Sequence, residues 1–327
     1  MYSHISRRRR HLLLGAAAAA AVAPFAAWSQ GLSARPVRFL LAQTPATTPD
    51  VIARLLAPRF QARWNQPFIV ENRPGAAGAI GMEALAKAPP DGHTMQIMPS
   101  SIVTLPHFFP NLSFDILRSF QPVSLVCSNN FALVAHSSVP ARDAREFISY
   151  AKAHPGMNYA SAGNGTSHHL FMEQLKISAG LQMTHIPYKG SAPAFNDLLG
   201  GHVPVMFMPI HVAMDMAKDG RVRVLGGSMR ERSPLYPDLP SLHEQGVRDF
   251  NGDTWFGLWG PAGLSADVVA KYGSELRAIL AEPELHEVFA KQGIVAQPST
   301  PEEMAAQLKA QFDAYERLIR TANIKAG

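Results

Sequence analysis

Two hydroxyl-rich segments of the chain carry side chains suited to holding a small anion. The first, at 43–50, reads QTPATTPD, and the second, at 159–168, reads YASAGNGTSH. Each segment follows an apolar run and precedes an amphipathic one, so each is expected to open a helix. Helix N-termini carry unpaired N–H groups and about half a positive charge, and glycine lets a ligand approach the backbone closely. If the two segments face each other, they could hold the two ends of a small carboxylate.

The first segment also contains signals for the start of a helix. Thr48 is predicted to cap this helix, with Pro49 at the first helical position and Asp50 in the first turn. The alternative is that both segments are ordinary capped helix starts, as in most strand–helix proteins, with no role in binding. The sequence alone leaves these two interpretations open.

Motifs for catalysis and metal binding are mostly absent. The sequence has no Gly-x-Ser-x-Gly nucleophile elbow, no phosphate-binding loop and no His-Glu-x-x-His. Ser149 and Lys152 fit a Ser-x-x-Lys pattern, but its companion motifs are missing. His168 and His169 are neighbours on a predicted helix, so their side chains point about 100° apart and make a poor chelate. We therefore expect no metal, no cofactor and no enzymatic activity, with an exported hydrolase that uses Ser161 or Ser149 as the alternative.

The elements that position these residues alternate between strand and helix. Strands are expected at 37–41, 68–70, 95–98, 157–160, 184–187 and 203–207. Helices are expected to begin at 50, 79, 143, 167, 192 and 301. Two successive strand–helix sets with a helical C-terminus predict an α/β protein in which helices flank each sheet. The chain would cross between the two sets near 126–131 and near 228–252.

The N-terminus reads as an export signal, with Arg7 to Arg10 before a short alanine-rich apolar run. Cleavage is expected between Ser29 and Gln30, by the general secretion route or by the twin-arginine route. Without residues 1–29 the formal charge falls from +5 to about +1, so no basic block remains to suggest nucleic acid. The single Cys127 excludes an internal disulfide and a multi-cysteine metal site.

A longer pattern resembles one protein family. It begins with the segment 70–81, VENRPGAAGAIG, and continues through Pro90-Asp91-Gly92 to Trp255-Phe256-Gly257. Between them lie His185-Ile186-Pro187-Tyr188-Lys189-Gly190 and Asp197-Leu198-Leu199-Gly200-Gly201. In this order the segments resemble the periplasmic solute receptors of tripartite tricarboxylate transporters, called Bug receptors.

The resemblance implies the two-lobed fold of a type II periplasmic binding protein, with two crossings between the lobes. Lobe 1 would contain 30–127 and 252–327, and lobe 2 would contain 128–251. Such a receptor binds a small carboxylate or an amino-acid-like ligand between its lobes, in the periplasm, and acts as a monomer. Its partners would be the membrane components of a transporter. A sensor without a transport role is a variant of the same interpretation.

The first loop departs from the family pattern, which usually has an aromatic residue and two adjacent glycines there. Gln43 replaces the aromatic residue, and Ala46 and Thr47 replace the glycines. A Cβ makes positive φ costly at these positions, so the loop is expected to use different donors or to reshape the pocket. The predicted ligand-binding residues are Gln43, Thr47, Thr48, Asp50, Ser100, Ser161, Gly163, Gly165, Thr166, His168 and Tyr188.

Overall fold

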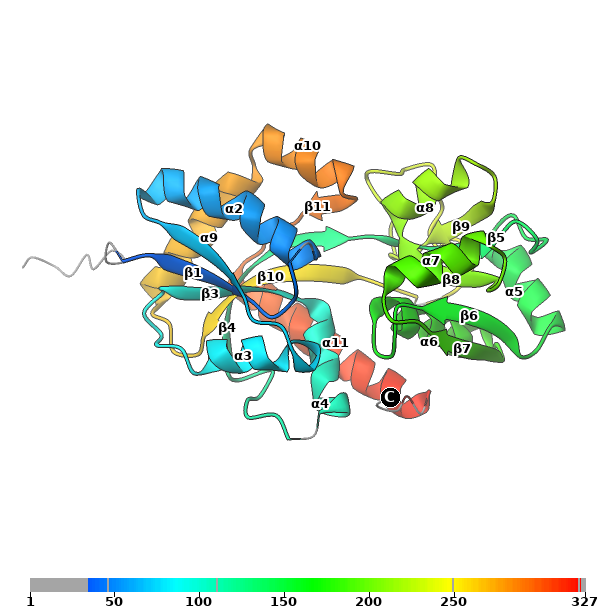
Figure 1. Cartoon of the computed structure of the whole chain (residues 1–327), viewed down its shortest axis with the longest axis horizontal. Coiled ribbons are helices and arrows are strands. Elements are labelled where there is room, and N and C mark those ends of the chain that lie inside the picture. Colours follow the sequence, from blue (N-terminus) through cyan, green and yellow to red (C-terminus); the bar gives the residue numbers. More distant parts are fainter. Residues whose placement is uncertain (1–34, 46, 110, 249, 323, 325–327) are drawn as a thin grey trace, which may run out of the picture. The chain divides into compact units, whose positions relative to one another are not determined.

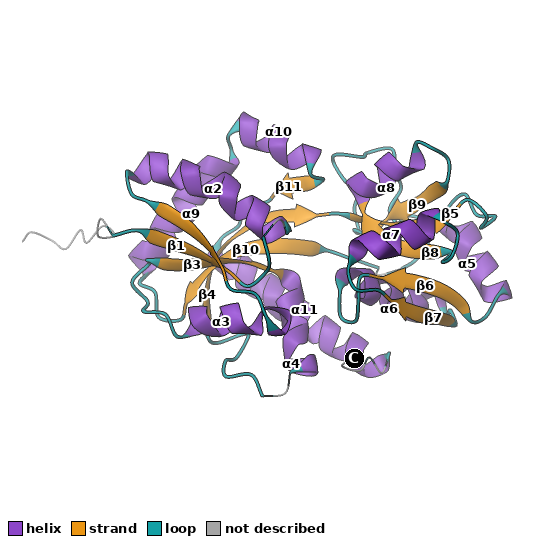
Figure 2. Ribbon diagram, in the orientation of Figure 1, coloured by secondary structure: helices purple, strands orange, loops and turns teal. Residues whose placement is uncertain are grey.

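The computed structural model describes residues 35–45, 47–109, 111–248, 250–322 and 324. The predicted signal peptide (1–29) and Ala46 lie outside these residues. Within them, the strands form a six-stranded and a five-stranded sheet, and helices pack on both faces of each (Figures 1 and 2). This arrangement confirms the predicted α/β fold. In the described part of the chain, no helix is long and apolar enough to span a membrane.

The six-stranded sheet has the order β11-β4-β10-β3-β1-β2. β1, β2 and β3 are parallel, whereas β10 runs antiparallel to both β3 and β4. The strands are β1 (Val37–Leu41), β2 (Phe68–Asn72), β3 (Thr94–Pro99), β4 (Phe120–Asn129), β10 (Thr254–Pro261) and β11 (Ile294–Ala296). The associated helices are α2 (Thr48–Trp64), η1 (Ala76–Gly78), α3 (Ala79–Ala86), η2 (Ser100–Thr104), α4 (Leu105–Phe108), α9 (Ala266–Leu280), α10 (Pro283–Lys291) and α11 (Pro301–Thr321).

Both faces of this sheet are buried. On one face, α2 and α9 cover an aromatic cluster in which the ring centroid of Phe39 lies 5.7 Å from that of Phe60 and 5.3 Å from that of Phe68. On the other face, α3 and α11 cover a core that includes Leu40, Met98 and Trp255. The central strand β10 is buried along its whole length, which is typical of strands in sheets covered on both faces.

The five-stranded sheet has the order β7-β6-β8-β5-β9. Its strands are β5 (Phe131–His136), β6 (Met157–Ser161), β7 (Met183–Pro187), β8 (Val205–Pro209) and β9 (Val222–Gly227). Its helices are α5 (Ala144–Ala153), α6 (Ser167–Ala179), α7 (Ser191–Leu199) and α8 (Ile210–Ala217). Successive side chains of β5 enter different cores, since Leu133 belongs to one cluster and Val134 to another.

The chain passes between the two sheets at two adjacent points. Strand pairing continues to Asn129 in β4 and begins at Thr254 in β10, and these two residues are partners. The crossings are therefore short, at Asn130 and at 252–253. Ser228 ties them together, since its Oγ donates to the carbonyl of Gly252 (2.7 Å) and accepts from the Phe131 N–H (3.3 Å). The exact lobe boundaries stay a prediction.

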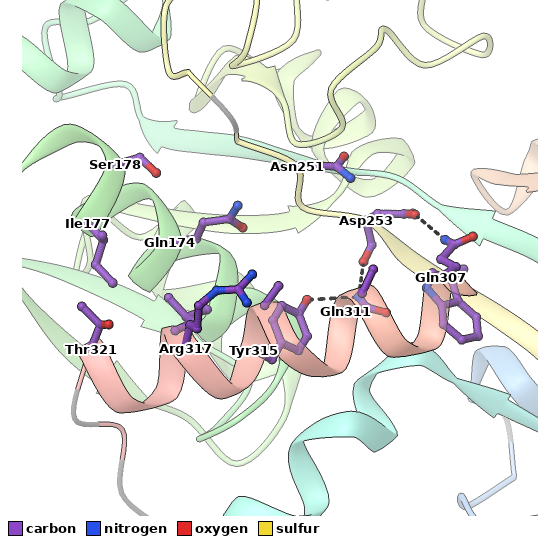
Figure 3. Close-up of a pocket in the computed structure, with 14 residues that line it drawn as sticks. Gln174, Ile177, Ser178, Asn251, Asp253, Gln307, Gln311, Tyr315, Arg317 and Thr321 are labelled. Carbon is purple, nitrogen blue, oxygen red and sulfur yellow. Dashed lines mark hydrogen bonds between the residues drawn. The ribbon is translucent and has the colours of Figure 1, made fainter. Parts of the chain in front are cut away.

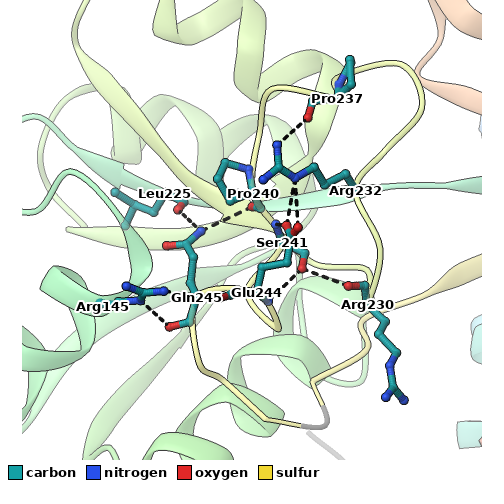
Figure 4. A network of polar contacts seen from close by, with 9 residues as sticks. All are labelled: Arg145, Leu225, Arg230, Arg232, Pro237, Pro240, Ser241, Glu244 and Gln245. Carbon is teal, nitrogen blue, oxygen red and sulfur yellow. Dashed lines mark hydrogen bonds and ion pairs between the residues drawn. The ribbon is translucent and has the colours of Figure 1, made fainter.

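The second crossing is much shorter than the predicted segment 228–252. Most of that segment folds back beside β9, where a polar network holds it (Figure 4). Glu244 accepts from Arg232 Nε (3.0 Å) and from the Ser241 N–H (2.8 Å). Gln245 Nε2 donates to the Leu225 carbonyl (2.9 Å), and Arg145 Nε donates to the Gln245 carbonyl (3.0 Å). The sequence pattern did not reveal this network because two of its bonds join Gln245 to residues 20 and 100 positions away.

Candidate ligand-binding site

The first predicted loop opens helix α2 in an unusual way. The N-cap is Thr47, so the prediction that Thr48 caps the helix was wrong by one residue. Pro49 permits either start, because the first two helical N–H groups need no partner within the helix. The Thr47 hydroxyl does not cap the helix; it donates to the Thr44 carbonyl (2.8 Å). The first turn of α2 therefore has no side-chain acceptor from its N-cap.

Helix α6 opens in the same way in the second predicted loop. Its N-cap is Thr166, whose hydroxyl donates to the Gly163 carbonyl (2.7 Å) rather than capping the helix. By contrast, Thr300 accepts from the Glu303 N–H (3.2 Å) and caps α11, whose start at 301 the sequence predicted. Both threonines thus leave the first-turn N–H groups of their helices without a side-chain cap, a state that suits an external anion where such a helix end is accessible.

A cavity of about 200 Å³ lies between the first loop, the segment after β3 and the α6 loop. Its lining residues are all uncharged: Gln43, Pro99, Ser101, Ile102, Thr104, Leu105, Phe108, Asn164, Gly165 and Thr166. Three predicted residues, Gln43, Gly165 and Thr166, therefore share one cavity, although they come from the two different sheets. A ligand here would meet hydroxyls, carboxamides and a helix N-terminus on one side, and apolar side chains on another.

Gly165 is required where it stands. Its φ is +72°, and a Cβ added to it would lie 2.6 Å from Cε2 of Phe108. Phe108 belongs to α4, on the side of the six-stranded sheet. The absence of a side chain at Gly165 therefore lets the two sides of the cavity approach each other closely.

The last residue of β2, within the family-like segment, holds the first loop in place. Asn72 Nδ2 donates to the Gln43 carbonyl (3.1 Å) and to Asp50 Oδ1 (3.0 Å). Asp50 Oδ2 accepts from Arg54 Nε (2.9 Å), and the Asp50 side chain is only 4% exposed. Asp50 therefore supports the loop and does not line the cavity. Gln43 lines it, and its Oε1 is buried without a hydrogen-bond partner among the described residues.

Comparison with known proteins agrees with this geometry. The sequence profile of the "Tripartite tricarboxylate transporter family receptor" matches residues 52–324. The chain belongs to this receptor family. BugT of Bordetella pertussis is 29% identical over 295 residues, which cover 89% of this chain and 90% of BugT. A protein encoded between tcbD and tcbE in Pseudomonas sp. (strain P51) is 32% identical over 87% of this chain and 85% of its own length.

Solved structures extend the comparison. The periplasmic binding protein BugD is 31% identical, with a TM-score of 0.72 over 89% of this chain and 98% of BugD. An R. palustris protein solved with adipate is 27% identical, with a TM-score of 0.77 over 90% of this chain and 99% of its own. MatC from Rhodopseudomonas palustris, solved with bound malate, is 27% identical, with a TM-score of 0.72 over 87% and 99% of the two chains. The predicted two-lobed periplasmic binding protein fold is thereby confirmed.

Several predicted residues of the receptor lie outside the cavity lining. Ser100 is buried, and its Oγ accepts from the Trp255 N–H (3.4 Å), whereas the neighbouring Ser101 lines the cavity. The Tyr188 hydroxyl donates to Asp197 (2.6 Å), and burial together with this bond raises the pKa of Tyr188 to about 12. Thr47 and Thr48 are half-buried and also do not line the cavity. The sequence analysis missed Ser101, Thr104 and Asn164, although Asn164 lies within the second predicted segment.

The adjacent histidines of the receptor have separate roles. His168 is buried, and its ring centroid lies 5.2 Å from that of Phe131. Burial lowers its pKa to about 4, and neither ring nitrogen has a hydrogen-bond partner among the described residues. His169 Nδ1 accepts from the Gly165 N–H (3.1 Å) and so fixes the α6 loop. In the described part of the chain, no group of three or more His, Cys, Asp or Glu residues could hold a metal ion.

Ser161 and His185 form a close pair, with 2.6 Å between Oγ and Nε2. This arrangement resembles a nucleophile and its base, but Ser161 is completely buried. Its Oγ also accepts from the Gly163 N–H (3.0 Å), and burial lowers the pKa of His185 to about 4. A substrate cannot reach this hydroxyl without rearrangement of the loop, so the pair stabilises the turn at Gly163.

Proposed function

We propose that this receptor captures a small carboxylate or an amino-acid-like ligand in the cavity and delivers it to the membrane components of a tripartite tricarboxylate transporter. The observation that carries the proposal is the open N-terminus of α6 at an uncharged cavity. Thr166 lines the cavity without capping the helix. An anion placed there receives hydrogen bonds from neutral donors and a favourable helix dipole.

The size of the cavity and the ligands of the relatives support a short carboxylate. A volume of about 200 Å³ holds a molecule of a few carbon atoms. The relatives solved with adipate and malate are similar to this receptor over most of its length. Gln43 adds a carboxamide to the wall of the cavity, which favours a ligand with a second polar group.

We further propose that the two lobes, 30–127 with 252–327 and 128–251, close on the ligand. The short crossings at Asn130 and 252–253 limit the hinge to a few residues, as in other binding proteins that close around a ligand. The ligand favours closure only through contacts that it makes in the closed form. Contacts with both Gln43 and Thr166 would meet this condition, because these residues come from different sheets.

The remaining parts of the proposal concern location and activity. Export by the predicted signal at 1–29 would bring the receptor to the periplasm, where members of its family act. We infer that it acts as a monomer and catalyses no reaction, since Ser161 is buried and the Ser149 hydroxyl donates to the Arg145 carbonyl (3.0 Å) of its own helix. A sensor that passes the bound state to a membrane signalling protein is a variant that uses the same site.

The test is calorimetric titration with a panel of short mono- and dicarboxylates, followed by one pair of variants. On binding, the Thr166 hydroxyl would turn from the Gly163 carbonyl to the ligand, so T166V is expected to weaken the best ligand by about 10- to 100-fold, because a lost hydroxyl contact costs about 1–3 kcal/mol in a buried site. T184V is the control, since Thr184 is exposed on β7 and its hydroxyl also donates to a carbonyl (3.3 Å, Gly156). Equal affinity of T166V and the wild-type protein would remove the Thr166 hydroxyl from the site.

A further inference from the structure

A second, larger pocket lies beside the crossing at 252–253, apart from the ligand cavity. It has a volume of about 450 Å³, and its lining shares no residue with the first cavity (Figure 3). Its walls are α6 and the C-terminal part of α11, and its floor is the crossing segment itself. The lining residues are Gln174, Ile177, Ser178, Asn251, Asp253, Trp255, Gln307, Ala310, Gln311, Ala314, Tyr315, Arg317, Leu318 and Thr321.

The floor of the pocket carries hydrogen-bond acceptors that lack donors. Asp253 Oδ2 accepts from Gln307 Nε2 (3.1 Å), but Asp253 Oδ1 is buried without a partner among the described residues. Gln311 Nε2 donates to the Asp253 carbonyl (3.2 Å), and Gln311 Oε1 is likewise buried and unpartnered in the described part of the chain. Burial raises the pKa of Asp253 to about 6. A buried acceptor without a donor is costly, so this end of the pocket favours a ligand that donates hydrogen bonds.

The other end of the pocket carries a positive charge. Arg317 is exposed, forms no ion pair with any described residue, and extends from α11 along the pocket in Figure 3. On the same helix, Arg320 lies outside the lining and pairs with Glu316 (2.7 Å). Ile177, Trp255 and Leu318 supply apolar surface to the lining. The pocket lining therefore combines the carboxylate of Asp253, an apolar surface and the guanidinium of Arg317.

We propose that this pocket is a second binding site, for a free amino acid with an apolar side chain, whose ammonium group faces Asp253 and whose carboxylate faces Arg317. Such a zwitterion matches both charged residues of the lining, and its ammonium group supplies the missing donors. Gln311 and Arg317 are separated by about 9 Å along the helix axis, at 1.5 Å per residue. Because helical side chains lean toward the N-terminus, Arg317 reaches back toward Asp253 and shortens this distance.

The position of the pocket links it to the first cavity. Its walls come from α6, which packs on the five-stranded sheet, and from α11, which packs on the six-stranded sheet. A ligand that contacts both helices favours one arrangement of them over another, and this preference changes the affinity of the first cavity for its carboxylate. By linkage, the carboxylate must change the affinity for the amino acid by the same factor.

Titration calorimetry with L-leucine and L-phenylalanine tests the assignment, with tryptophan fluorescence as a second signal. Two analogues of leucine, 4-methylpentanoate and 3-methylbutylamine, each lack one charged group and should bind at least about tenfold more weakly. The affinity for leucine should fall about tenfold from pH 7.5 to pH 5, because protonation of Asp253 removes its charge. The other charged or titratable groups of the lining are Tyr315 and Arg317, and α6 contributes only uncharged residues. An affinity that rises toward pH 5 would overturn the zwitterion assignment.

Variants separate this site from the ligand cavity. R317Q and A314W should abolish amino-acid binding, whereas R320Q and A306W, on the same helix but outside the lining, should not. S101W fills the first cavity and should leave leucine binding intact. Thermal melts of each variant establish that it is folded. If leucine binding survives A314W and is lost in S101W, the amino acid binds in the first cavity. That result would refute the second site while supporting the proposed function.

Discussion

Replacement of His168 by phenylalanine should make the receptor less sensitive to acid. The His168 ring is buried beside Phe131, and burial lowers its pKa from the ordinary value of 6.5 to about 4 in the folded protein. The unfolded chain therefore binds a proton at a pH where the folded protein does not. The contribution of the neutral His168 ring to stability is fully present above pH 6.5 and is lost progressively as the pH falls toward 4.

The magnitude follows from the size of this shift. Each pKa unit corresponds to about 1.4 kcal/mol, so at pH 5 the neutral His168 costs the folded state about 2 kcal/mol relative to pH 8. H168F removes this cost. At pH 8 its free energy of unfolding should remain within about 1.5 kcal/mol of the wild-type value, because a ring of similar size replaces one whose nitrogens have no partner among the described residues.

The assay is urea unfolding followed by circular dichroism at pH 8, 6.5 and 5. The difference in free energy of unfolding between pH 8 and pH 5 should be about 2 kcal/mol smaller in H168F than in the wild-type protein. H202F, which changes an exposed histidine, is the control and should keep the wild-type pH dependence. An identical pH dependence in H168F and wild type would show that His168 is solvated or hydrogen-bonded in solution, and the account of its burial would fail.

Three further predictions concern the ligand cavity. G165A should lower the free energy of unfolding by about 2–3 kcal/mol, because alanine is strained at positive φ and its Cβ would collide with Phe108. The double variant F108A/G165A should recover part of this loss. A thermal melt of G165A like that of the wild-type protein would contradict the close approach of Gly165 to Phe108. N72A should lower the free energy of unfolding, measured by thermal melts, by about 1–3 kcal/mol, because it leaves Asp50 with fewer donors. The control N158A, on the exposed face of β6, should lower it little. Equal losses in both variants would show that the Asn72 hydrogen bonds do not stabilise the fold. Wild type and S161A should both fail to hydrolyse p-nitrophenyl esters, and a turnover that S161A abolishes would establish an enzyme instead.

The sequence predicted the elements well where local signals are strong. The strand at 37–41 is apolar at four of its five positions, with Arg38 as the exception, and the structure has β1 at Val37–Leu41. Thr300, Pro301 and Glu303 predicted the start of α11, and the structure shows a complete capping box there. The local sequence does not distinguish two starts of α2, because Thr47 and Thr48 are both good capping residues and Pro49 is compatible with either.

Details of the site depended on contacts that the sequence does not reveal. Ser100 and Ser101 are chemically equivalent, and the 3-10 turn after β3 decides which of them faces the cavity. The sequence predicted Tyr188 as a ligand contact, but in the structure its hydroxyl donates to Asp197, nine residues further along the chain. The role of Asn72 also appears only in three dimensions, since its side chain joins β2 to the first loop and to α2.

The pairing of Asn129 with Thr254 has a consequence for how this protein can be built. Because the chain leaves and re-enters the six-stranded sheet at neighbouring points, everything between them is attached through two closely spaced ends. A segment attached in this way can be treated as an insertion, and such segments tolerate excision and transplantation. A gene that encodes 130–253 alone, or one that joins 129 to 254 through a short glycine linker, should yield two soluble pieces. The two halves of the receptor would then be interchangeable parts for new sensors.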